Sequence, residues 1–206
     1  MTSRPGPDIV GAGQHRTGVT AMDTVAAING RRSIRDYEPR PVPRSLVEAI
    51  LHDAAQAPTP PVSGAEPFVF VATEGAARIA EHGAEALAFA REHRKPGAAY
   101  DWVDKPGFLV FFNAPAVIVI CGFDDEYGQS LQDCTRAGQN LVLSAYARGL
   151  GTCWIGSPMP WLRDPATRAR LGVPAGYTPQ AAFTLGYPAS VPSGKPREMP
   201  RIIWPS

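Results

Sequence analysis

The segment from Gly138 to Gly156, GQNLVLSAYARGLGTCWIG, joins the second half of a long helix to a short strand. The helix is predicted over Gln129 to Arg148, and its apolar residues lie on several sides: Leu131, Ala137, Leu141, Val142, Ala145 and Tyr146. A helix that is apolar nearly all round lies in a core or in a subunit interface. Gly149 is a natural C′ residue, and a strand over Thr152 to Ile155 follows it. The segment therefore predicts a buried helix that leads directly into a strand.

Further elements are predicted on both sides of this segment. Short apolar runs predict strands over 68–72, 116–121 and 180–185. Apolar spacing and capping residues predict helices over 23–29, 46–55, 74–94 and 161–170. Gly97 to Gly107 has the composition of a loop that can act as a lid. Strands mixed with long helices in irregular order indicate an α+β domain.

The two ends of the chain differ in composition from its middle. Residues 1–21 are rich in Gly, Pro, Ser and Thr and contain no apolar signal segment, so we expect a disordered extension there. The chain has 206 residues, of which 44% are hydrophobic, and this fits one domain over 22–206. The Pro-rich tail from Pro188 to Ser206 cannot form a compact element alone, so we expect it to lie along another surface.

Charge and cysteine content argue against several classes of protein. The net charge is +1, which gives no electrostatic reason to expect nucleic acid or a membrane surface as a partner. The most apolar stretch, Phe108 to Phe123, is interrupted by Asn113 and Pro115 and is too short to span a bilayer as a helix. The three cysteines form no disulfide framework, and no Cys or His has zinc-ligand spacing. We expect a cytoplasmic protein without a metal site.

Familiar nucleotide-binding and hydrolase motifs are absent from the sequence. A Walker A loop ending at Lys195 would need Gly where Ala189 stands and Ser or Thr where Pro196 stands. A dinucleotide fingerprint beginning at Gly149 would need a third Gly at Trp154. The chain also contains no G-x-S-x-G nucleophile elbow. P-loop and hydrolase functions are therefore disfavoured.

Two basic clusters are candidates for binding a phosphate group. The first, Arg31 to Arg35 (RRSIR), directly follows a predicted helix, and the second, Lys195 to Arg197 (KPR), is near the C-terminus. Guanidinium groups match the geometry of phosphate oxygens and stay charged at every relevant pH. The alternatives are a basic turn that favours the end of the preceding helix and ordinary tail charges.

Two further segments are candidates for contacting a planar ligand. The proline-rich loop from Ala57 to Phe68 forms either a rigid wall or a plain helix-to-strand connector. In Gly149 to Gly156, glycines bracket the predicted strand, so backbone amides there either approach a heterocycle or only cap a helix and complete a core strand. Cys153 is expected to be a buried small side chain, because no histidine lies near it in sequence.

Taken together, these segments resemble the FMN-dependent nitroreductase family. MDTVAAINGRRSIR, Met22 to Arg35, is similar to that family's opening helix and R-R-S-x-R motif. FFNAPAVIVI, Phe111 to Ile120, resembles its buried A-P-x-x-I strand, and Gly138 to Gly156 resembles its central helix and flavin-edge strand. LGVPAGYTPQAAFTLGYPA, Leu171 to Ala189, and the KPR of Lys195 to Arg197 match its late segments. The resemblance covers nearly everything from residue 22 to residue 197.

The resemblance implies FMN-binding roles for particular residues. Six would surround the phosphate, the ribityl chain and, for the last arginine of the first cluster, the flavin pyrimidine: Arg31, Arg32, Ser33, Arg35, Lys195 and Arg197. Five would line the flavin ring, the last two through backbone amides close to flavin N5: Thr152, Cys153, Trp154, Ile155 and Gly156. No side chain is expected to serve as a catalytic nucleophile or general acid.

One segment departs from the family's pattern. Members usually have A-P-S-x-x-N-x-Q-P-W, whereas this chain has APTPPVSGAEPF, with about two extra residues. Pro58, Thr59 and Pro60 are still implied as cofactor contacts, and Glu66 takes the place of Gln. An ionised Glu only accepts hydrogen bonds, whereas Gln also donates them. FMN contacts and substrate preference are both open to change here, unless the insertion turns Glu66 into solvent.

The resemblance also implies a fold, an assembly and an activity. The fold would be α+β, with a central, mainly antiparallel sheet flanked by helices, in an intertwined homodimer with two flavins at the interface. The enzyme would use NADH or NADPH to reduce a small nitroaromatic, quinone or enone-type acceptor in two alternating half-reactions. The alternatives are a specialised relative (a biosynthetic dehydrogenase, a dehalogenase or a flavin-cleaving enzyme) and a non-catalytic flavin-binding protein.

Overall fold

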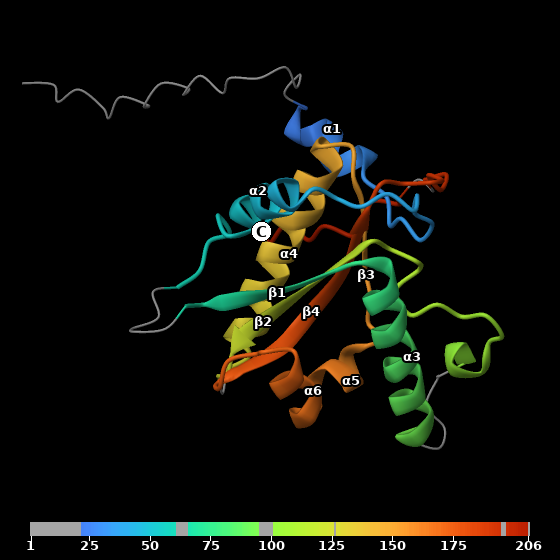
Figure 1. The fold of residues 1–206 in the computed structure, drawn as a ribbon. Coiled ribbons are helices and arrows are strands. Elements are labelled where there is room, and N and C mark those ends of the chain that lie inside the picture. Colours follow the sequence, from blue (N-terminus) through green and yellow to red (C-terminus); the bar gives the residue numbers. More distant parts are fainter. Residues whose placement is uncertain (1–21, 61–65, 95–100, 126, 195–196, 206) are drawn as a thin grey trace, which may run out of the picture.

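A four-stranded antiparallel sheet forms the centre of the structure (Figure 1). The structure is a computed structural model that describes residues 22–60, 66–94, 101–125, 127–194 and 197–205. The strands are β1 (Phe68–Glu74), β2 (Ala116–Phe123), β3 (Gly151–Trp154) and β4 (Tyr177–Gly186), in the order β1-β2-β4-β3. The expected α+β fold with an antiparallel sheet is confirmed, and the expected extension over 1–21 lies outside the described residues.

Helices cover both faces of this sheet. The helices are α1 (Thr24–Gly30), α2 (Arg44–Ala54), α3 (Ala76–Glu92), α4 (Gln129–Ala147), α5 (Met159–Arg163) and α6 (Pro165–Arg170), with a short 3₁₀ turn η1 (Asp101–Asp104). α2 and α4 lie on one side of the sheet, and α3, α5 and α6 lie on the other (Figure 1). No helix among the described residues is long and apolar enough to cross a membrane.

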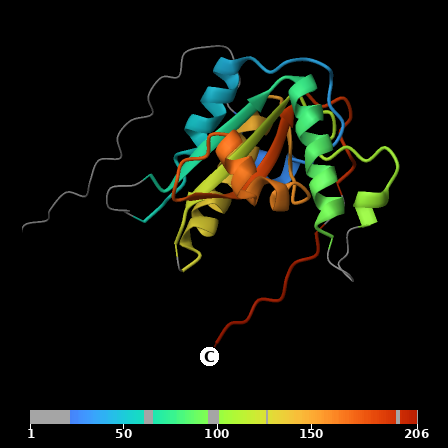
Figure 2. The ribbon, with the colours of Figure 1, turned by 60° about the horizontal axis from the view of Figure 1, so that its bottom comes forward.

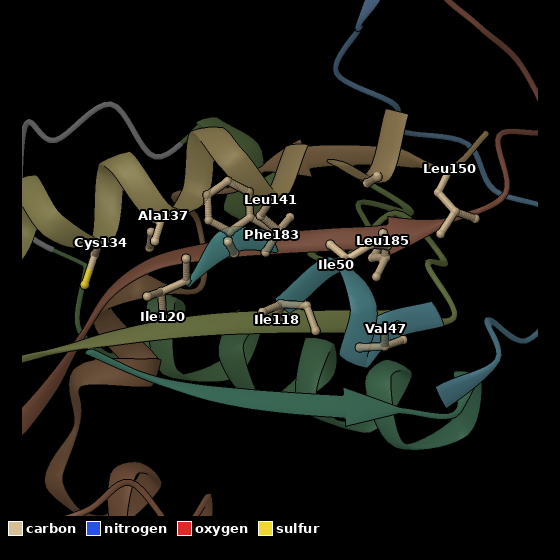
Figure 3. Packing of buried hydrophobic residues seen from close by; sticks show 14 of the residues in the cluster. Val47, Ile50, Ile118, Ile120, Cys134, Ala137, Leu141, Leu150, Phe183 and Leu185 are labelled. Atoms are coloured by element: carbon tan, nitrogen blue, oxygen red, sulfur yellow. The ribbon is translucent and has the colours of Figure 1, made fainter. Parts of the chain in front are cut away.

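The central strand β2 is buried on both faces. Ile118 and Ile120 point into the core beneath α2 and α4, whereas Val117, Val119 and Cys121 point into the core beneath α3 and α5. This alternation follows from the two-residue period of a strand. Figure 3 shows side chains of the first core, which come from α2, α4, β2 and β4. An apolar run without polar alternation therefore identifies the middle of the sheet.

α4 is buried along the face that meets the sheet. Cys134, Ala137, Leu141 and Ala145 have relative exposures of 0%, which confirms the core position expected for this helix. Its N-terminus is capped by Asp125, whose carboxylate accepts hydrogen bonds from the backbone N–H groups of residues 127, 129 and 130. These bonds lower the pKa of Asp125 to about 2. The helix ends at Ala147, and Gly149, two residues further on, has a φ of 75°.

The expected single helix over 161–170 is wrong, because the chain breaks it into α5 and α6. Asp164 has an extended conformation, with φ −58° and ψ 132°, and its side chain caps α6 by accepting from the Thr167 N–H at 3.0 Å. Pro165 explains the break, because a proline disfavours a helical conformation in the residue before it. The Asp164-Pro165 pair is the local sequence signal that predicts this break.

The C-terminal tail first runs along the segment that follows α1. The Glu38 N–H donates to the Tyr187 carbonyl at 2.9 Å, and the Ala189 N–H donates to the Asp36 carbonyl at 3.0 Å. The expectation that this tail lies along another surface is therefore confirmed for its first part. Figure 2 shows the last residues running away from the folded body. Trp204, with 85% of its surface exposed, belongs to that last part.

Candidate functional site

The first basic cluster begins where α1 ends. α1 is capped at its start by Asp23, which accepts a hydrogen bond from the Ala26 N–H. At its end, the Arg32 guanidinium donates from Nη1 to the carbonyls of residues 29, 30 and 31 at 2.7, 3.0 and 2.9 Å. A cation there also offsets the negative end of the helix dipole. Arg32 thus performs the helix-end role that the sequence left open, whereas Arg31 makes no side-chain hydrogen bond or ion pair among the described residues.

The next residues of the cluster pair with the free edge of β3. Ser33 forms a parallel bridge with Thr152, and the Ile34 N–H donates to the Thr152 carbonyl at 2.9 Å. The approach is close because Gly151 has no side chain: a Cβ there would clash with the Ile34 side chain. The structure therefore brings the first basic cluster and the glycine-bracketed strand together, although Ser33 and Gly151 are 118 positions apart in the sequence.

Cys153, a residue of β3, has its side chain beside Ser33 and Arg35 of the first basic cluster. The residue is 3% exposed, and burial raises the pKa of its thiol, although the neighbouring Arg35 and Ser33 side chains oppose that shift. The thiol is therefore protonated near neutral pH, and Cys153 is the buried small side chain that the sequence suggested. Arg35 also contacts an aromatic ring, because its guanidinium carbon lies 5.9 Å from the centre of the Phe112 ring. Phe112 has a φ of 51°, a conformation that is uncommon for a bulky residue.

A cleft of about 1050 Å³ opens beside this cluster. Its lining comes from α1, the first basic cluster, α4 and the tail: Ile28, Asn29, Arg31, Arg32, Ser33, Gln139, Ser193, Gly194 and Arg197. The tail lies directly against Arg32, because a Cβ on Gly194 would clash with that guanidinium. Three guanidinium groups from the two ends of the chain thus line one cleft, which is a donor set suited to a phosphate group.

A smaller cavity of about 180 Å³ adjoins the cleft through Arg31 and Arg32. Its remaining lining is mostly apolar and comes from α4, β3 and the tail: Ile34, Val142, Tyr146, Gly149, Leu150, Gly151, Thr152, Pro188 and Val191. Ligand sites usually combine apolar walls with a few polar groups that fix orientation. A cationic cleft that continues into an apolar cavity can hold a ligand with an anionic end and an apolar body.

The other residues predicted to line the ring have mixed placements. Trp154 is 47% exposed, and its ring centre lies 5.2 Å from that of Phe183. The Ile155 N–H donates to the Ala182 carbonyl at 2.9 Å, because the pairing of β3 with β4 continues one residue past the strand. That amide is therefore engaged within the fold, whereas the Gly156 N–H has no hydrogen-bond partner among the described residues.

The predicted loop residues do not line this cleft. Pro58, Thr59 and Pro60 follow α2 and are absent from its lining. Glu66 is exposed, precedes β1, and its carbonyl accepts a hydrogen bond from the Tyr177 hydroxyl at 2.8 Å. Lys195 lies outside the described residues.

The pairing of the strands shows that Glu66 lies far from the first basic cluster. Phe68, at the start of β1, pairs with Gly122, whereas Glu74, at its end, pairs with Ala116. Ala116 in turn lies beside Leu185, the partner of Thr152. Six residues of strand correspond to about 20 Å. Glu66 and the Ser33–Thr152 bridge therefore lie at opposite ends of the sheet.

Some residues of the site were missed by the sequence reasoning. Gln139 lines the cleft from α4, a helix that was interpreted only as core or interface. Tyr37 and Thr184 form a buried hydrogen bond of 2.6 Å behind the first basic cluster. Tyr37 follows that cluster by two residues, which is the only local signal it gives. No group of three or more potential metal ligands is found among the described residues.

Comparisons with known proteins agree with this architecture. A protein of the archaeon Methanothermobacter thermautotrophicus, named as an NADH dehydrogenase/NAD(P)H nitroreductase, is 32% identical over 177 residues, which cover 84% of this chain and 82% of that protein. A Bacteroides fragilis nitroreductase structure with bound FMN is 23% identical, covers 90% of this chain and 100% of its own, and has a TM-score of 0.76. A Desulfitobacterium hafniense nitroreductase structure with bound FMN is 26% identical, covers 87% and 95%, and has a TM-score of 0.72.

The sequence profile of the Nitroreductase family matches residues 28–187. This range runs from α1 through the first basic cluster to the end of β4, and so includes most of the elements that build the cleft. The profile match and the identity to the archaeal relative together show that this chain belongs to the nitroreductase family.

Proposed function

We propose that this protein is an FMN-dependent oxidoreductase that takes electrons from NADH or NADPH. The observation that carries the proposal is the cleft in which Arg31, Arg32 and Arg197 meet beside the edge of β3. The family match, the two neighbours with bound FMN and the relative named NAD(P)H nitroreductase support it.

The residues present fit FMN. The phosphate would lie among the guanidinium groups of Arg31, Arg32 and Arg197, with the Ser33 hydroxyl as a further donor. Arg31 offers its whole guanidinium, because none of its nitrogen atoms has a partner among the described residues. Guanidinium groups crowded on a terminal phosphate leave little room for an adenylate, so we expect FMN and not FAD. Lys195 would complete the phosphate site.

When bound, FMN supplies the electron transfer between a nicotinamide and an acceptor. The protein supplies binding, orientation and charge. Arg35 stands beside β3 and would stabilise negative charge at the pyrimidine end of the flavin. The protonated Cys153 thiol and the exposed Trp154 ring would contact the ring system without entering the chemistry. No side chain of this chain needs to act as a nucleophile.

We also propose a homodimer in which each FMN site is completed by the partner subunit. Pro58 to Pro60 and Glu66 were predicted to contact FMN, yet they do not line the cleft of their own subunit. A second copy would bring them to the neighbouring cleft. Exposed apolar residues next to the cleft and in the tail are consistent with such an interface: Val25, Ile28, Met199, Ile203 and Trp204.

The acceptor is proposed by class: a nitroaromatic, a quinone or an enone. A specialised relative remains the alternative among enzymes, because the altered loop around Glu66 is where this chain leaves its family's pattern. A non-catalytic flavin-binding protein is the alternative from another functional class. The three proposals differ in whether a nicotinamide reduces the bound flavin and whether a common acceptor reoxidises it.

The test combines a spectrum with kinetics. Purified protein should be yellow, and denaturation should release FMN. NADH or NADPH should reduce the bound flavin, and a quinone or a nitroaromatic should sustain turnover with parallel double-reciprocal lines. Released FAD, or a colourless protein that FMN does not reconstitute, would contradict the proposed cofactor. Bound FMN that neither nicotinamide reduces would favour the specialised or non-catalytic alternatives, and intersecting lines would argue against a shared site for donor and acceptor.

A further inference from the structure

We propose that Tyr37 and Thr184 are positioning residues for the FMN site, and that their two hydroxyl groups fix the first basic cluster against β3. The inference rests on the proposed function, because it concerns how the same cleft is held in shape. Neither residue lines the cleft. They act through the backbone of Ile34 and Cys153, which lie beside residues proposed to contact FMN.

The two hydroxyls form a chain of hydrogen bonds between two segments of backbone. The Tyr37 hydroxyl donates to the Ile34 carbonyl at 2.8 Å and lies 2.6 Å from the Thr184 Oγ1. The Cys153 N–H donates to the same Thr184 oxygen at 3.2 Å. A backbone N–H only donates and a carbonyl only accepts, so the ends of the chain fix its direction. Because the single Tyr37 hydroxyl proton goes to the Ile34 carbonyl, the Thr184 hydroxyl donates to the Tyr37 oxygen at 2.6 Å. The other acceptor that this hydroxyl reaches, the Cys153 carbonyl, is more distant, at 3.4 Å.

Burial makes this chain sensitive to the loss of either hydroxyl. Tyr37 is 3% exposed and Thr184 is 0% exposed, so water has little access to replace a missing partner. Burial also raises the pKa of Tyr37, which keeps its hydroxyl protonated and able to donate. Removing the Tyr37 hydroxyl takes the side-chain donor from the buried Ile34 carbonyl, and removing the Thr184 hydroxyl takes away the bridge between Tyr37 and the Cys153 N–H. A buried polar group that loses its partner costs more than an ordinary hydrogen bond is worth.

The Ile34 backbone is held on both sides. Its N–H donates to the Thr152 carbonyl at 2.9 Å, and its carbonyl accepts from Tyr37. The neighbours of Ile34 in sequence are Ser33 and Arg35, whose side chains flank the Cys153 thiol. A shift at Ile34 therefore moves two groups that are proposed to bind FMN. Small misplacements of binding groups have large effects on bound geometry.

Thr184 allows a matched pair of variants. Thr184→Val keeps the shape of the side chain and removes its hydroxyl, whereas Thr184→Ser keeps the hydroxyl and removes a methyl group. If Thr184 only packs in the core, Ser is the more disruptive change. If its hydroxyl positions the site, Val is the more disruptive change. Tyr37→Phe tests the other member of the chain with the ring retained.

The experiment measures FMN binding to apoprotein by flavin fluorescence and the reduction potential of the bound flavin. Thr184→Val and Tyr37→Phe should each weaken FMN binding by about 10-fold, the equivalent of one net hydrogen bond. Thr184→Ser should stay within about 3-fold of the wild type. The variant that carries both Thr184→Val and Tyr37→Phe should bind FMN no more weakly than the weaker-binding single variant, because both changes break the same chain of hydrogen bonds. The flavin potential should shift in the same two variants and not in Thr184→Ser.

Two controls separate positioning from general loss of stability. Ile79→Val removes a methyl group from the core beneath α3, away from the cleft. Tyr187→Phe removes a tyrosine hydroxyl that makes no hydrogen bond among the described residues. Both controls should bind FMN as the wild type does, even where Ile79→Val lowers the Tm.

Several outcomes would overturn the inference. They are equal FMN affinity in Thr184→Val and the wild type, a larger loss in Thr184→Ser than in Thr184→Val, and an equal loss in Ile79→Val. If Thr184→Val does not fold, Tyr37→Phe decides by the same comparison. A folded wild type that fails to bind FMN would overturn the proposed function as well. Tight FMN binding that is unchanged in Thr184→Val and in Tyr37→Phe would overturn only the positioning role.

Discussion

Arg31 and Arg32 are neighbours in the sequence, but their side chains have different partners in the fold. Arg32 donates to three carbonyls at the end of α1 and supports the turn that follows. Arg31 has no such partner among the described residues and lines both the cleft and the adjoining cavity. Of these two arginines, Arg31 is therefore the one whose whole guanidinium is available to a phosphate, whereas Arg32 uses its Nη1 in the fold.

Arg31→Ala should weaken FMN binding without loss of the fold. A hydrogen bond to a charged group is worth about 1.5–3 kcal/mol, so the dissociation constant should rise by about 10- to 150-fold. Titration of apoprotein with FMN measures the change. Because the lost contact is ionic, the difference from the wild type should shrink at high salt.

Arg44→Ala is the control for the loss of a positive charge. Arg44 is exposed at the start of α2 and pairs with Glu48 on the same helix. This variant should bind FMN as the wild type does, since an exposed pair contributes little. Equal affinities in Arg31→Ala and Arg44→Ala would remove Arg31 from the phosphate site.

Among the elements, α4 has an N-terminus that is capped by a single side chain, that of Asp125. Asp125 accepts backbone hydrogen bonds from residues 127, 129 and 130, and these bonds satisfy N–H groups that a helix start leaves without partners. The carboxylate also interacts favourably with the positive end of the helix dipole. α4 in turn supplies Gln139 to the cleft, so the cap stabilises a helix that shapes the candidate site.

Asp125→Ala should lower the thermal stability of the protein in a pH-dependent way. The pKa of Asp125 falls from 3.8 to about 2 on folding, so the charged form is favoured by the native state. Its contribution is complete above about pH 4 and is lost as the pH falls through about 2. The difference in Tm between variant and wild type should therefore narrow across that window, as followed by circular dichroism.

The adjacent Asp124 provides the matched control. Its side chain makes no hydrogen bond or ion pair among the described residues. Asp124→Ala should have a Tm close to that of the wild type at every pH measured. A Tm difference for Asp125→Ala that stays constant from pH 7 to pH 2 would mean that the carboxylate charge does not support the cap.

For the whole molecule, we predict a dimer that the C-terminal tail helps to hold together. The last residues of the chain leave the folded body (Figure 2), and Met199, Ile203 and Trp204 are 80%, 71% and 85% exposed. Contiguous exposed apolar patches mark interaction surfaces, and these three residues lie within six positions of the tail. Sedimentation velocity at low micromolar concentration should show a single species of twice the chain mass.

Truncation before Glu198 should shift this equilibrium toward monomer and reduce FMN content. Both losses should occur together, because the proposed site is completed by the partner subunit. Removal of residues 2–21, which the sequence predicts to be a disordered extension, is the matched control and should change neither. A flavin-loaded monomer in the full-length protein would contradict the dimer proposal.

Mixed dimers extend the same prediction to the shared site. Arg31→Ala removes a group from the cleft, whereas replacement of Pro58 to Pro60 by Gly-Ser-Gly alters the loop that would come from the partner. Coexpressed with different affinity tags, these two variants should form a mixed dimer with one intact site. Its FMN content should exceed that of either homodimer, and FMN content no higher than in the homodimers would place the loop outside the site.

The sequence by itself determined the secondary structure and the α+β class, because these depend on local signals. The apolar run of β2 and the glycine after α4 act within a few residues, and both predicted the observed elements. The same locality explains the missed break between α5 and α6, where one proline outweighed an apolar period. The family resemblance came from motifs of the same short range.

Only the tertiary structure decided which of these local groups meet. Arg197 and Arg31 line one cleft because the tail runs back along the segment after α1. Tyr37 and Thr184, 147 residues apart, share a hydrogen bond because β3 and β4 are neighbours in the sheet. The directions of the two side chains likewise decide that Arg32, and not Arg31, donates to the carbonyls at the end of α1. Such pairings follow from long-range packing, and no periodicity or spacing in the chain encodes them.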